Sequence, residues 1–572
     1  MSTAQFAPGV EVFRELREEG YYYVDKTALI SELLNNVAKV SLITRPRRFG
    51  KTLTMSMLGE FFDIEKDSSA IFTDLSIAHD TEMCSKWMNC YPVLSISLKG
   101  MTENSFDKVL YNLSGIIQEI CIFKKYLLES DKVSSADKIS LQAFTLRNIT
   151  DYKLNGSITT VLRALYMHWG KPVIVLIDEY DVPLANAFQQ GFYADMAAFM
   201  RNFLGDALKG NSTYKFAVLT GCLRISKESI FTGLNNFTSY GIETAQFADK
   251  FGFTAQEVDA LLHAAQHEEK KASIKAWYDG YQFGNIQEIY CPWDIFEYLH
   301  ELRTDPTLTP RAYWDNTSSN DIVKTFLRSS HFDVKGKWEQ LIRGEAVSAN
   351  IIESLTYEEL FDSEDHLWTI LYLTGYLTKA RKKDAPNHPL KNAHQADALP
   401  SEEKSLLVIP NEEVRQIFIR SVDSWFRDLA FSSDRQQFFD ALWAGRTEEV
   451  EEHLSAFLLQ SVSYYDSHFE YCHGFMSGVF FKSGYGITSN DECGDGRPDL
   501  VIEDRKQRRV AIIEIKHTKK VEDFPVLART ALRQIQEKNY AAPFREHDGI
   551  TILLWGIAFC KKSCRALFVH EQ

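Results

Sequence analysis

The sequence lacks any apolar run long enough to cross a bilayer. Its longest such stretch, residues 550–559, is about half of the ~20 residues that a membrane-spanning helix needs. The first 20 residues hold four acidic side chains and no apolar core like that of a signal peptide. We therefore predict a cytoplasmic protein with no membrane partner.

The cysteine spacing of a zinc site is also missing. The nine cysteines are an odd number, and no two of them are separated by two residues as in a CxxC pair. No combination of His and Cys has the spacing of zinc ligands. This cysteine usage fits a reducing compartment.

Positive charge is scarce, because 63 Lys and Arg face 78 Asp and Glu, for a formal net charge of −15. Residues 461–572, however, hold 16 Lys and Arg against 15 Asp and Glu, a net charge of +1, which leaves −16 for the first 460 residues. Within an acidic protein, the least acidic segment is where a module that faces nucleic acid is expected.

The composition is that of a folded protein, with 45% hydrophobic and 13% aromatic residues. A chain of 572 residues is too long for one core, and about 150 residues per domain predicts three or four domains. We expect these at 1–250, 251–330, 331–460 and 461–572.

Short apolar strands alternate with helical patterns over the first 250 residues. Such alternation predicts a parallel sheet covered by helices on both faces. The predicted strands are 39–44, 92–98, 173–177 and 215–220, and the predicted helices include 52–62, 158–169 and 196–208.

The pattern then becomes helical. A capping box at Thr254 and Glu257 opens a predicted helical lid over 251–330, and 331–460 reads as a mainly helical connector. From residue 461 the chain returns to an α/β pattern with a helix at 469–480, two strands, a helix and a last strand at 551–558. The predicted fold class is therefore α/β and multidomain.

The first candidate site follows the strand at 39–44. Gly50, Lys51 and Thr52 supply the glycine, the lysine and the Mg²⁺-binding hydroxyl of a phosphate-binding loop. The first glycine of the usual motif is replaced by Arg45, and Arg45, Arg47 and Arg48 are expected to crowd the loop with positive charge.

Two carboxylates end the predicted strand 173–177 and strengthen this interpretation. Asp178 is placed to hold Mg²⁺, and Glu179 to orient attacking water. Thr220, at the end of the next strand, is placed to contact a γ-phosphate, and Arg224 to add a charge there. A strand-end cap is an equally good interpretation of Thr220, and a surface arginine is an equally good interpretation of Arg224. The alternative for the whole pattern is a sheet protein that binds no nucleotide.

The second candidate site lies near the C-terminus. If a turn centres between residues 506 and 507, antiparallel pairing places Asp499 opposite Glu514, with Lys516 on the same face. Two carboxylates, a lysine and the Ile515 carbonyl suit Mg²⁺ or Mn²⁺, and Glu470, which shares a helix face with His473, is a further candidate ligand. The alternative is a solvated edge strand of alternating charge.

These motifs resemble those of the AAA-ATPase-like family of bacterial proteins fused to a PD-(D/E)XK nuclease-like domain. The resemblance rests on segments 22–27, 45–52, 178–181, 220–227, 233–236, 278–281, 374–377 and on Gly496-Arg497-Pro498-Asp499. It implies a P-loop fold with a lid, followed by a restriction-endonuclease-like α/β domain. Arginine at position 45 and the Gln-Ile pair at Gln534 are features of that family.

The resemblance also implies ATP and Mg²⁺ as cofactors, with Mn²⁺ an alternative at the nuclease-like site. The residues expected to bind nucleotide are Arg48, Phe49, Gly50, Lys51, Thr52, Asp178, Thr220 and Arg224. Those expected to hold metal are Thr52, Asp178, Glu470, Asp499, Glu514 and Ile515. The catalytic candidates are Glu179, Asp499, Glu514 and Lys516.

Together, the two sites predict an ATPase that is also a metal-dependent nuclease, in which ATP controls cleavage of nucleic acid, with DNA favoured over RNA. Two other functions stay open. One is an ATP-dependent module that binds or remodels nucleic acid without cutting it, and the other is a nucleotide-switched interaction protein. The assembly state is not determined by the sequence, and a homo-oligomer is compatible with it.

Overall fold

The chain divides into two compact units, one of residues 1–318 and 344–415 and the other of residues 319–343 and 416–572. The computed structural model describes residues 5–36, 38–147, 154–224, 237–314, 335–353, 355, 357–380, 404–421, 436–461, 476, 479–480, 485–488, 496–518, 520–545, 549–560 and 563–571. Within these ranges, no helix combines the length and apolar character needed to span a bilayer. The predicted domain boundaries at 250, 330 and 460 stay a prediction.

The first unit is built on a five-stranded sheet in the order β2-β3-β4-β1-β5, and every pair in it is parallel. The strands are β1 (Val40–Thr44), β2 (Val93–Ser97), β3 (Val173–Asp178), β4 (Tyr214–Gly221) and β5 (Phe237–Tyr240). All residues of β1 and β3 are buried, as expected for central strands covered on both faces. The predicted parallel sheet is confirmed.

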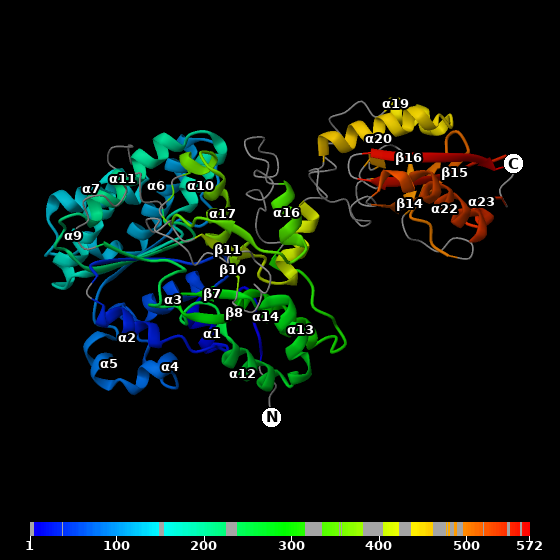
Figure 1. Ribbon diagram of the computed structural model, residues 1–572. Coiled ribbons are helices and arrows are strands. Elements are labelled where there is room, and N and C mark those ends of the chain that lie inside the picture. Colours follow the sequence, from blue (N-terminus) through cyan, green and yellow to red (C-terminus); the bar gives the residue numbers. More distant parts are fainter. Residues whose placement is uncertain are drawn as a thin grey trace, which may run out of the picture. The chain divides into compact units, whose positions relative to one another are not determined.

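Helices cover the two faces of this sheet (Figure 1). Side chains of α1, α2, α3 and α4 form one core with Ile43, Ile174, Leu176 and Val218 of the strands. These helices are α1 (Phe13–Glu18), α2 (Ala28–Asn35), α3 (Lys51–Phe62) and α4 (Ser69–Phe72). The remaining helices of this part are α5 (Thr81–Trp87), α6 (Phe106–Phe123), α7 (Ser135–Thr145), α9 (Ser157–Trp169), α10 (Val182–Gln190) and α11 (Tyr193–Leu208).

The region after residue 250 contains the predicted helices and also two small sheets that were not predicted. Its helices are α12 (Ala255–Ala265), which starts with the predicted capping box, α13 (Lys271–Tyr278), α14 (Pro292–Leu302) and α17 (Glu364–Leu373). One sheet joins β6 (Phe253–Thr254), β7 (Tyr281–Phe283) and β8 (Ile286–Tyr290), and the other joins β9 (Val347–Ala349), β10 (Thr378–Lys379) and β11 (Ser405–Val408). Strands of two to five residues are too short to show a two-residue period.

The second unit contains a five-stranded sheet in the order β12-β13-β14-β15-β16. Only the pair β14 and β15 is parallel. The strands are β12 (Gly486–Thr488), β13 (Leu500–Asp504), β14 (Arg509–His517), β15 (Thr551–Cys560) and β16 (Ser563–Glu571). The sequence analysis missed β12 and β16, which are edge strands with a half-polar face.

Helices also cover both faces of the second sheet. Figure 1 shows α19 (Gln436–Trp443) and α20 (Thr447–Ser461) on one side and α22 (Phe524–Glu537) on the other. The α19 and α20 side is filled by residues such as Ile513 and Ile515, and the α22 side by residues such as Ile512. Because side chains alternate along a strand, Glu514 and Lys516 belong to the face that α22 covers. The unit also contains α16 (Lys335–Ile342) and α23 (Ala542–Arg545).

Candidate functional site

The predicted phosphate loop connects the end of β1 to the start of α3. Gly50, which caps α3, has a φ of 83°, a left-handed conformation that favours glycine. No side chain caps this helix, so its first backbone N–H groups are open to an anion. Thr52 lies in the first turn and is half-buried. The loop therefore combines a left-handed glycine with an uncapped helix start, two features of phosphate-binding loops.

Lys51 points into this loop. Its side chain is buried, and Nζ donates hydrogen bonds to the carbonyl oxygens of Arg45 at 3.1 Å and Pro46 at 2.9 Å. Nζ also lies 3.7 Å from Sγ of Cys222 in the turn that follows β4. The ammonium group is thus held by carbonyl dipoles, without a carboxylate partner among the described residues, and a phosphate oxygen is a stronger acceptor.

The two predicted acids stand at the end of β3, on the same edge of the sheet. Oγ1 of Thr220 donates to Oδ1 of Asp178, while Oδ2 of Asp178 is buried and has no hydrogen-bond partner in the described part of the chain. Since β4 lies between β1 and β3, it places Thr220 between the loop and the acids. The structure brings the predicted loop, acid and threonine together.

Glu179 follows Asp178 with a φ of 55°, which is unusual for a residue with a side chain. Burial raises the pKa of Glu179, the charge of Lys51 lowers it, and Asp178 and Asp181 raise it further. Lys51 and Glu179 therefore interact electrostatically across the site. A residue in a strained conformation beside a buried acid is typical of functional positions.

Arg45 does not line the loop, which corrects the expectation that all three arginines crowd it. Its guanidinium is completely buried, and the four oxygens that accept its hydrogen bonds, at 2.8–3.1 Å, are the carbonyls of Thr44, Tyr240, Gly241 and Phe247. Burial lowers the pKa of Arg45 to about 9. The arginine at the first glycine position ties the start of the loop to the segment after β5.

Arg48 turns toward α14, and Phe49 turns toward β7. The guanidinium carbon of Arg48 lies 4.1 Å from the ring centre of Trp293, and the buried Phe49 ring contacts the rings of Tyr281 at 5.0 Å and Phe283 at 5.2 Å. The Phe49 side chain is therefore a core residue that fixes the loop, and only its backbone is left for the predicted role in nucleotide binding.

Sequence reasoning gave no role to Tyr180 and Asp181, yet both hold the turn that follows β4. Oδ2 of Asp181 accepts the N–H groups of Cys222 at 2.8 Å and Leu223 at 2.9 Å, and the Tyr180 hydroxyl donates to the Leu223 carbonyl at 2.7 Å. A Cβ on Gly221 would lie 2.7 Å from Oδ1 of Asp181. The sequence signal that could have pointed to Tyr180 and Asp181 was their position in the motif segment 178–181.

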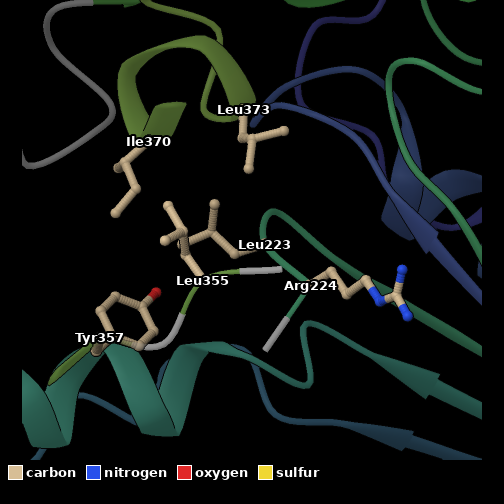
Figure 2. Close-up of a pocket in the computed structure, with 6 residues that line it drawn as sticks. All are labelled: Leu223, Arg224, Leu355, Tyr357, Ile370 and Leu373. Atoms are coloured by element: carbon tan, nitrogen blue, oxygen red, sulfur yellow. The ribbon is translucent and has the colours of Figure 1, made fainter. Parts of the chain in front are cut away.

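Arg224 lies at the end of the same turn, beside a small apolar pocket. Figure 2 shows the side chains of Leu223, Leu355, Ile370 and Leu373 converging, with Tyr357 below them. The guanidinium of Arg224 points away from this group, and Nε is buried without a hydrogen-bond partner among the described residues. The lining of the pocket is mainly apolar.

The second candidate site forms at the paired ends of β13 and β14. Leu500 pairs with Ile513, which places Asp499 opposite Glu514, the register predicted from the sequence. Oδ2 of Asp499 accepts the backbone N–H of Ile515 at 2.6 Å, and Nζ of Lys516 donates to Oε1 of Glu514 at 2.7 Å. β14 is a central strand, so the alternative of a solvated edge strand is wrong.

Glu514 is the most constrained group of this site. Its side chain is 3% exposed, and Oε2 has no hydrogen-bond partner in the described ranges. Burial raises the pKa of Glu514, the Lys516 hydrogen bond lowers it, and the charge of Asp499 raises it. Two buried carboxylates side by side repel each other unless a cation or a proton lies between them.

The Ile515 backbone faces β13. In an antiparallel ladder, the N–H and C=O of one residue face the same partner strand, so the N–H bond to Asp499 places the Ile515 carbonyl on the β13 side as well. The regular pairing of the two strands ends at Leu500 and Ile513. Pro498, which precedes Asp499, has no N–H and so cannot extend the ladder as a donor. The oxygen donors predicted from this hairpin therefore lie at the same end of β13 and β14.

α22 lies directly over the sheet beside this site. A Cβ on Gly556, which pairs with Glu514, would lie 2.3 Å from the carbonyl oxygen of Ala528 and 2.7 Å from the nitrogen of Leu532. Gln534 of the same helix donates to the Tyr540 hydroxyl at 3.4 Å. Gly556 was not recognised from the sequence. Glycine is needed at this position because the backbone of α22 passes too close for a Cβ atom. Glu470 and His473 lie outside the described residues.

Two family comparisons agree with these geometries. Residues 7–231 match the model of the family described as predicted AAA-ATPase, and residues 469–568 match that of the PD-(D/E)XK nuclease superfamily. The chain therefore carries an AAA-ATPase-like domain followed by a PD-(D/E)XK nuclease-superfamily domain, which supports an ATP-binding protein with a nuclease-like domain.

Two individual relatives were also found. The chain is 25% identical over 573 residues to a protein of Azotobacter chroococcum mcd 1 named "Uncharacterized protein in vnfD 5'region", and the match covers 98% of each chain. The solved structure titled "Structure of C. elegans PCH-2" matches 63% of this chain and 68% of its own, with 13% identity and a TM-score of 0.18. A TM-score this low supports no conclusion about the fold.

Proposed function

We propose that this protein is a divalent-metal-dependent nuclease that cleaves nucleic-acid phosphodiesters at Asp499, Glu514 and Lys516, under the control of ATP bound at the phosphate loop. The observation that carries the proposal is the pairing of Asp499 with Glu514, together with the unpartnered Oε2 of Glu514. A buried carboxylate oxygen without a donor is costly unless a cation is its partner.

The donors at this site fit Mg²⁺ or Mn²⁺. Asp499, Glu514 and the Ile515 carbonyl offer only oxygen, which these ions prefer. A bound divalent ion supplies a Lewis acid for the scissile phosphate and lowers the pKa of coordinated water. Lys516 holds Glu514 in place through its hydrogen bond and brings a positive charge to the position where a phosphate would lie. The described residues contain no group of three or more His, Cys, Asp or Glu side chains arranged for metal, and the proposed donor set accordingly combines two carboxylates with a backbone carbonyl.

The nucleotide site supports control by ATP. Lys51 and the open N–H groups of α3 suit the phosphates, Thr52 and Asp178 suit Mg²⁺, and Thr220 lies next to Asp178. The half-buried Glu179 is placed to orient water for hydrolysis. The loop is packed against residues far along the chain, so a change at the phosphates reaches the β6–β8 and 357–377 segments.

The test is an incubation of the full chain with plasmid, single-stranded DNA and RNA, with and without ATP and Mn²⁺. We expect Mn²⁺-dependent degradation whose rate changes with ATP, and we expect DNA to be the better substrate. Glu514→Ala should abolish degradation and leave ATP hydrolysis intact. Glu503→Ala is the matched control, since Glu503 lies on the same strand, β13, and its partly exposed carboxylate forms an ion pair with the exposed Arg505.

Two results would contradict the proposal. A Glu514→Ala protein that still cuts at the normal rate would place the cleavage site elsewhere. A wild-type protein that binds nucleic acid but cuts none of the three substrates would favour the ATP-dependent binding module instead.

A further inference from the structure

The three arginines of the phosphate loop have different surroundings. The guanidinium of Arg45 is enclosed by four carbonyls, and that of Arg48 lies over the ring of Trp293. Arg47 is exposed, and its side chain makes no hydrogen bond or ion pair with any residue that the structure describes. Arg47 is therefore the arginine of this loop whose donors are available to a ligand.

Arg47 lies on the acid side of the loop. Its electrostatic neighbours are Cys222, Tyr376, Asp181 and Tyr357. Cys222 is also the residue that Lys51 Nζ approaches to 3.7 Å. Two cations, Lys51 and Arg47, thus converge on one residue, two positions after the threonine that bonds to Asp178.

The charges of Lys51 and Arg47 favour the binding of an anionic ligand near Cys222. Asp181 is 4% exposed, and its Oδ1 has no hydrogen-bond partner within the described ranges, while Oδ2 is used by the turn. The carboxylate is therefore fixed and attracts Arg47 toward the end of β4 without engaging it in a hydrogen bond. A guanidinium held in this way keeps its planar set of donors for the oxygens of a phosphate.

We propose that Arg47 contacts the terminal phosphate of the bound nucleotide and so distinguishes a nucleoside triphosphate from a diphosphate. This inference rests on the proposed nucleotide site. The terminal phosphate is the one expected next to Asp178, Glu179 and Thr220, and two of the electrostatic neighbours of Arg47, Asp181 and Cys222, follow those residues closely in the chain. The arginine is supplied by the same chain, from within the loop that also carries Lys51.

The segment that contains Tyr357 and Tyr376 lies against the phosphate loop. A Cβ on Gly375, which has a φ of 90°, would lie 2.8 Å from Cβ of Pro46, so this segment lies directly on the loop next to Arg47. Tyr376 stacks on Trp314 with 5.1 Å between ring centres. These contacts hold the segment that carries Tyr376 against the loop beside Arg47.

The test compares the affinities of the wild-type protein and its variants for a non-hydrolysable ATP analogue and for ADP, by calorimetry in the presence of Mg²⁺. Arg47→Ala should weaken binding of the analogue about tenfold and that of ADP much less, because a charge-assisted hydrogen bond is lost only from the terminal phosphate. The affinity of Arg47→Lys for the analogue should fall between those of the wild type and Arg47→Ala, since lysine keeps the charge but not the fork of donors. Arg303→Ala, an exposed arginine at the end of α14, is the matched control.

The outcomes separate this inference from the nucleotide site itself. Equal losses for the analogue and ADP, or no loss for either, would overturn the role of Arg47 while the site stands. A wild-type protein that binds neither ligand would overturn both. Because Arg47 is exposed, thermal unfolding of Arg47→Ala should match that of the wild type, so a failure to fold would also contradict the proposal.

Discussion

Ile515 donates its backbone N–H to Oδ2 of Asp499 across 2.6 Å, and Asp499 lies one position beyond the last regular pair of β13 and β14, Leu500 with Ile513. A carboxylate side chain here takes the place that a backbone carbonyl holds in the ladder. The bond fixes Asp499 against β14, next to Glu514. The position of Asp499 is thus set by the sheet.

Removing the ammonium group of Lys51 should abolish nucleotide binding. In Lys51→Ala, the loop keeps its backbone but loses the buried charge that faces the phosphates. A calorimetric titration with ATP should show no binding, whereas Lys108→Ala, on the exposed side of α6, should bind normally. Unchanged binding by Lys51→Ala would remove the nucleotide from this loop.

Arg45→Ala should destabilise the first unit by about 3 kcal/mol, because four carbonyls each lose a charge-assisted hydrogen bond in a buried setting. Arg45→Lys should also destabilise it, since an ammonium group cannot reach all four oxygens. Chemical denaturation followed by tryptophan fluorescence measures the change. If both variants were as stable as the wild type, the inward position of Arg45 would be wrong.

Lys516→Met should move the pH dependence of Mn²⁺ binding to higher pH. Burial raises the pKa of Glu514 and Lys516 counteracts this, so removing the lysine raises that pKa further. Glu514 must be ionised to hold a cation, and binding should therefore fall at a higher pH on acidification. Mn²⁺ titrations across the pH range measure the midpoint, and a midpoint that stays in place or drops contradicts the role of Lys516.

The raised pKa of Glu514 also affects the stability of the second unit when no metal is bound. Because the folded pKa of Glu514 lies above its unfolded value, the carboxyl favours folding below the unfolded pKa. This contribution is lost as the pH rises through the folded pKa. Mn²⁺ should accordingly stabilise the second unit more at neutral than at acidic pH.

Gly556→Ala should destabilise the second unit by about 1–3 kcal/mol, the usual cost of overpacking. The added methyl group would meet backbone atoms of α22, which cannot move independently of the helix. Gly486→Ala is the control, because its Cβ would come no closer than 3.4 Å to any atom. Denaturant unfolding compares the two, and hydrogen exchange of α22 amides shows where the structure loosens. Equal stability would mean that α22 shifts freely.

The sequence predicted those features that arise from local patterns. Four of the five strands of the first sheet, β1 to β4, follow from short apolar runs, and the register of Asp499 with Glu514 follows from a turn centred between residues 506 and 507. The polar edge strands β12 and β16 and the short strands β6 to β11 carry too few residues or too mixed a pattern for such reasoning.

The parts of the site that were missed depend on distant contacts. Nothing local to Arg45 shows that it turns inward, because its four acceptors include carbonyls about 200 residues later. The need for glycine at position 556 likewise comes from the backbone of a helix that passes over it. Tyr180 and Asp181 act on a turn some 40 residues away, so their motif marked them without showing their role.

The support of the phosphate loop by Tyr281 and Gly375 bears on how this chain can be dissected. The AAA-ATPase family match ends at residue 231, before either supporting residue. A fragment cut there would expose Phe49 and Pro46 to solvent and lose the walls that shape the loop. The smallest autonomous nucleotide-binding piece therefore has to reach past residue 377, well beyond the segment that its family signature outlines.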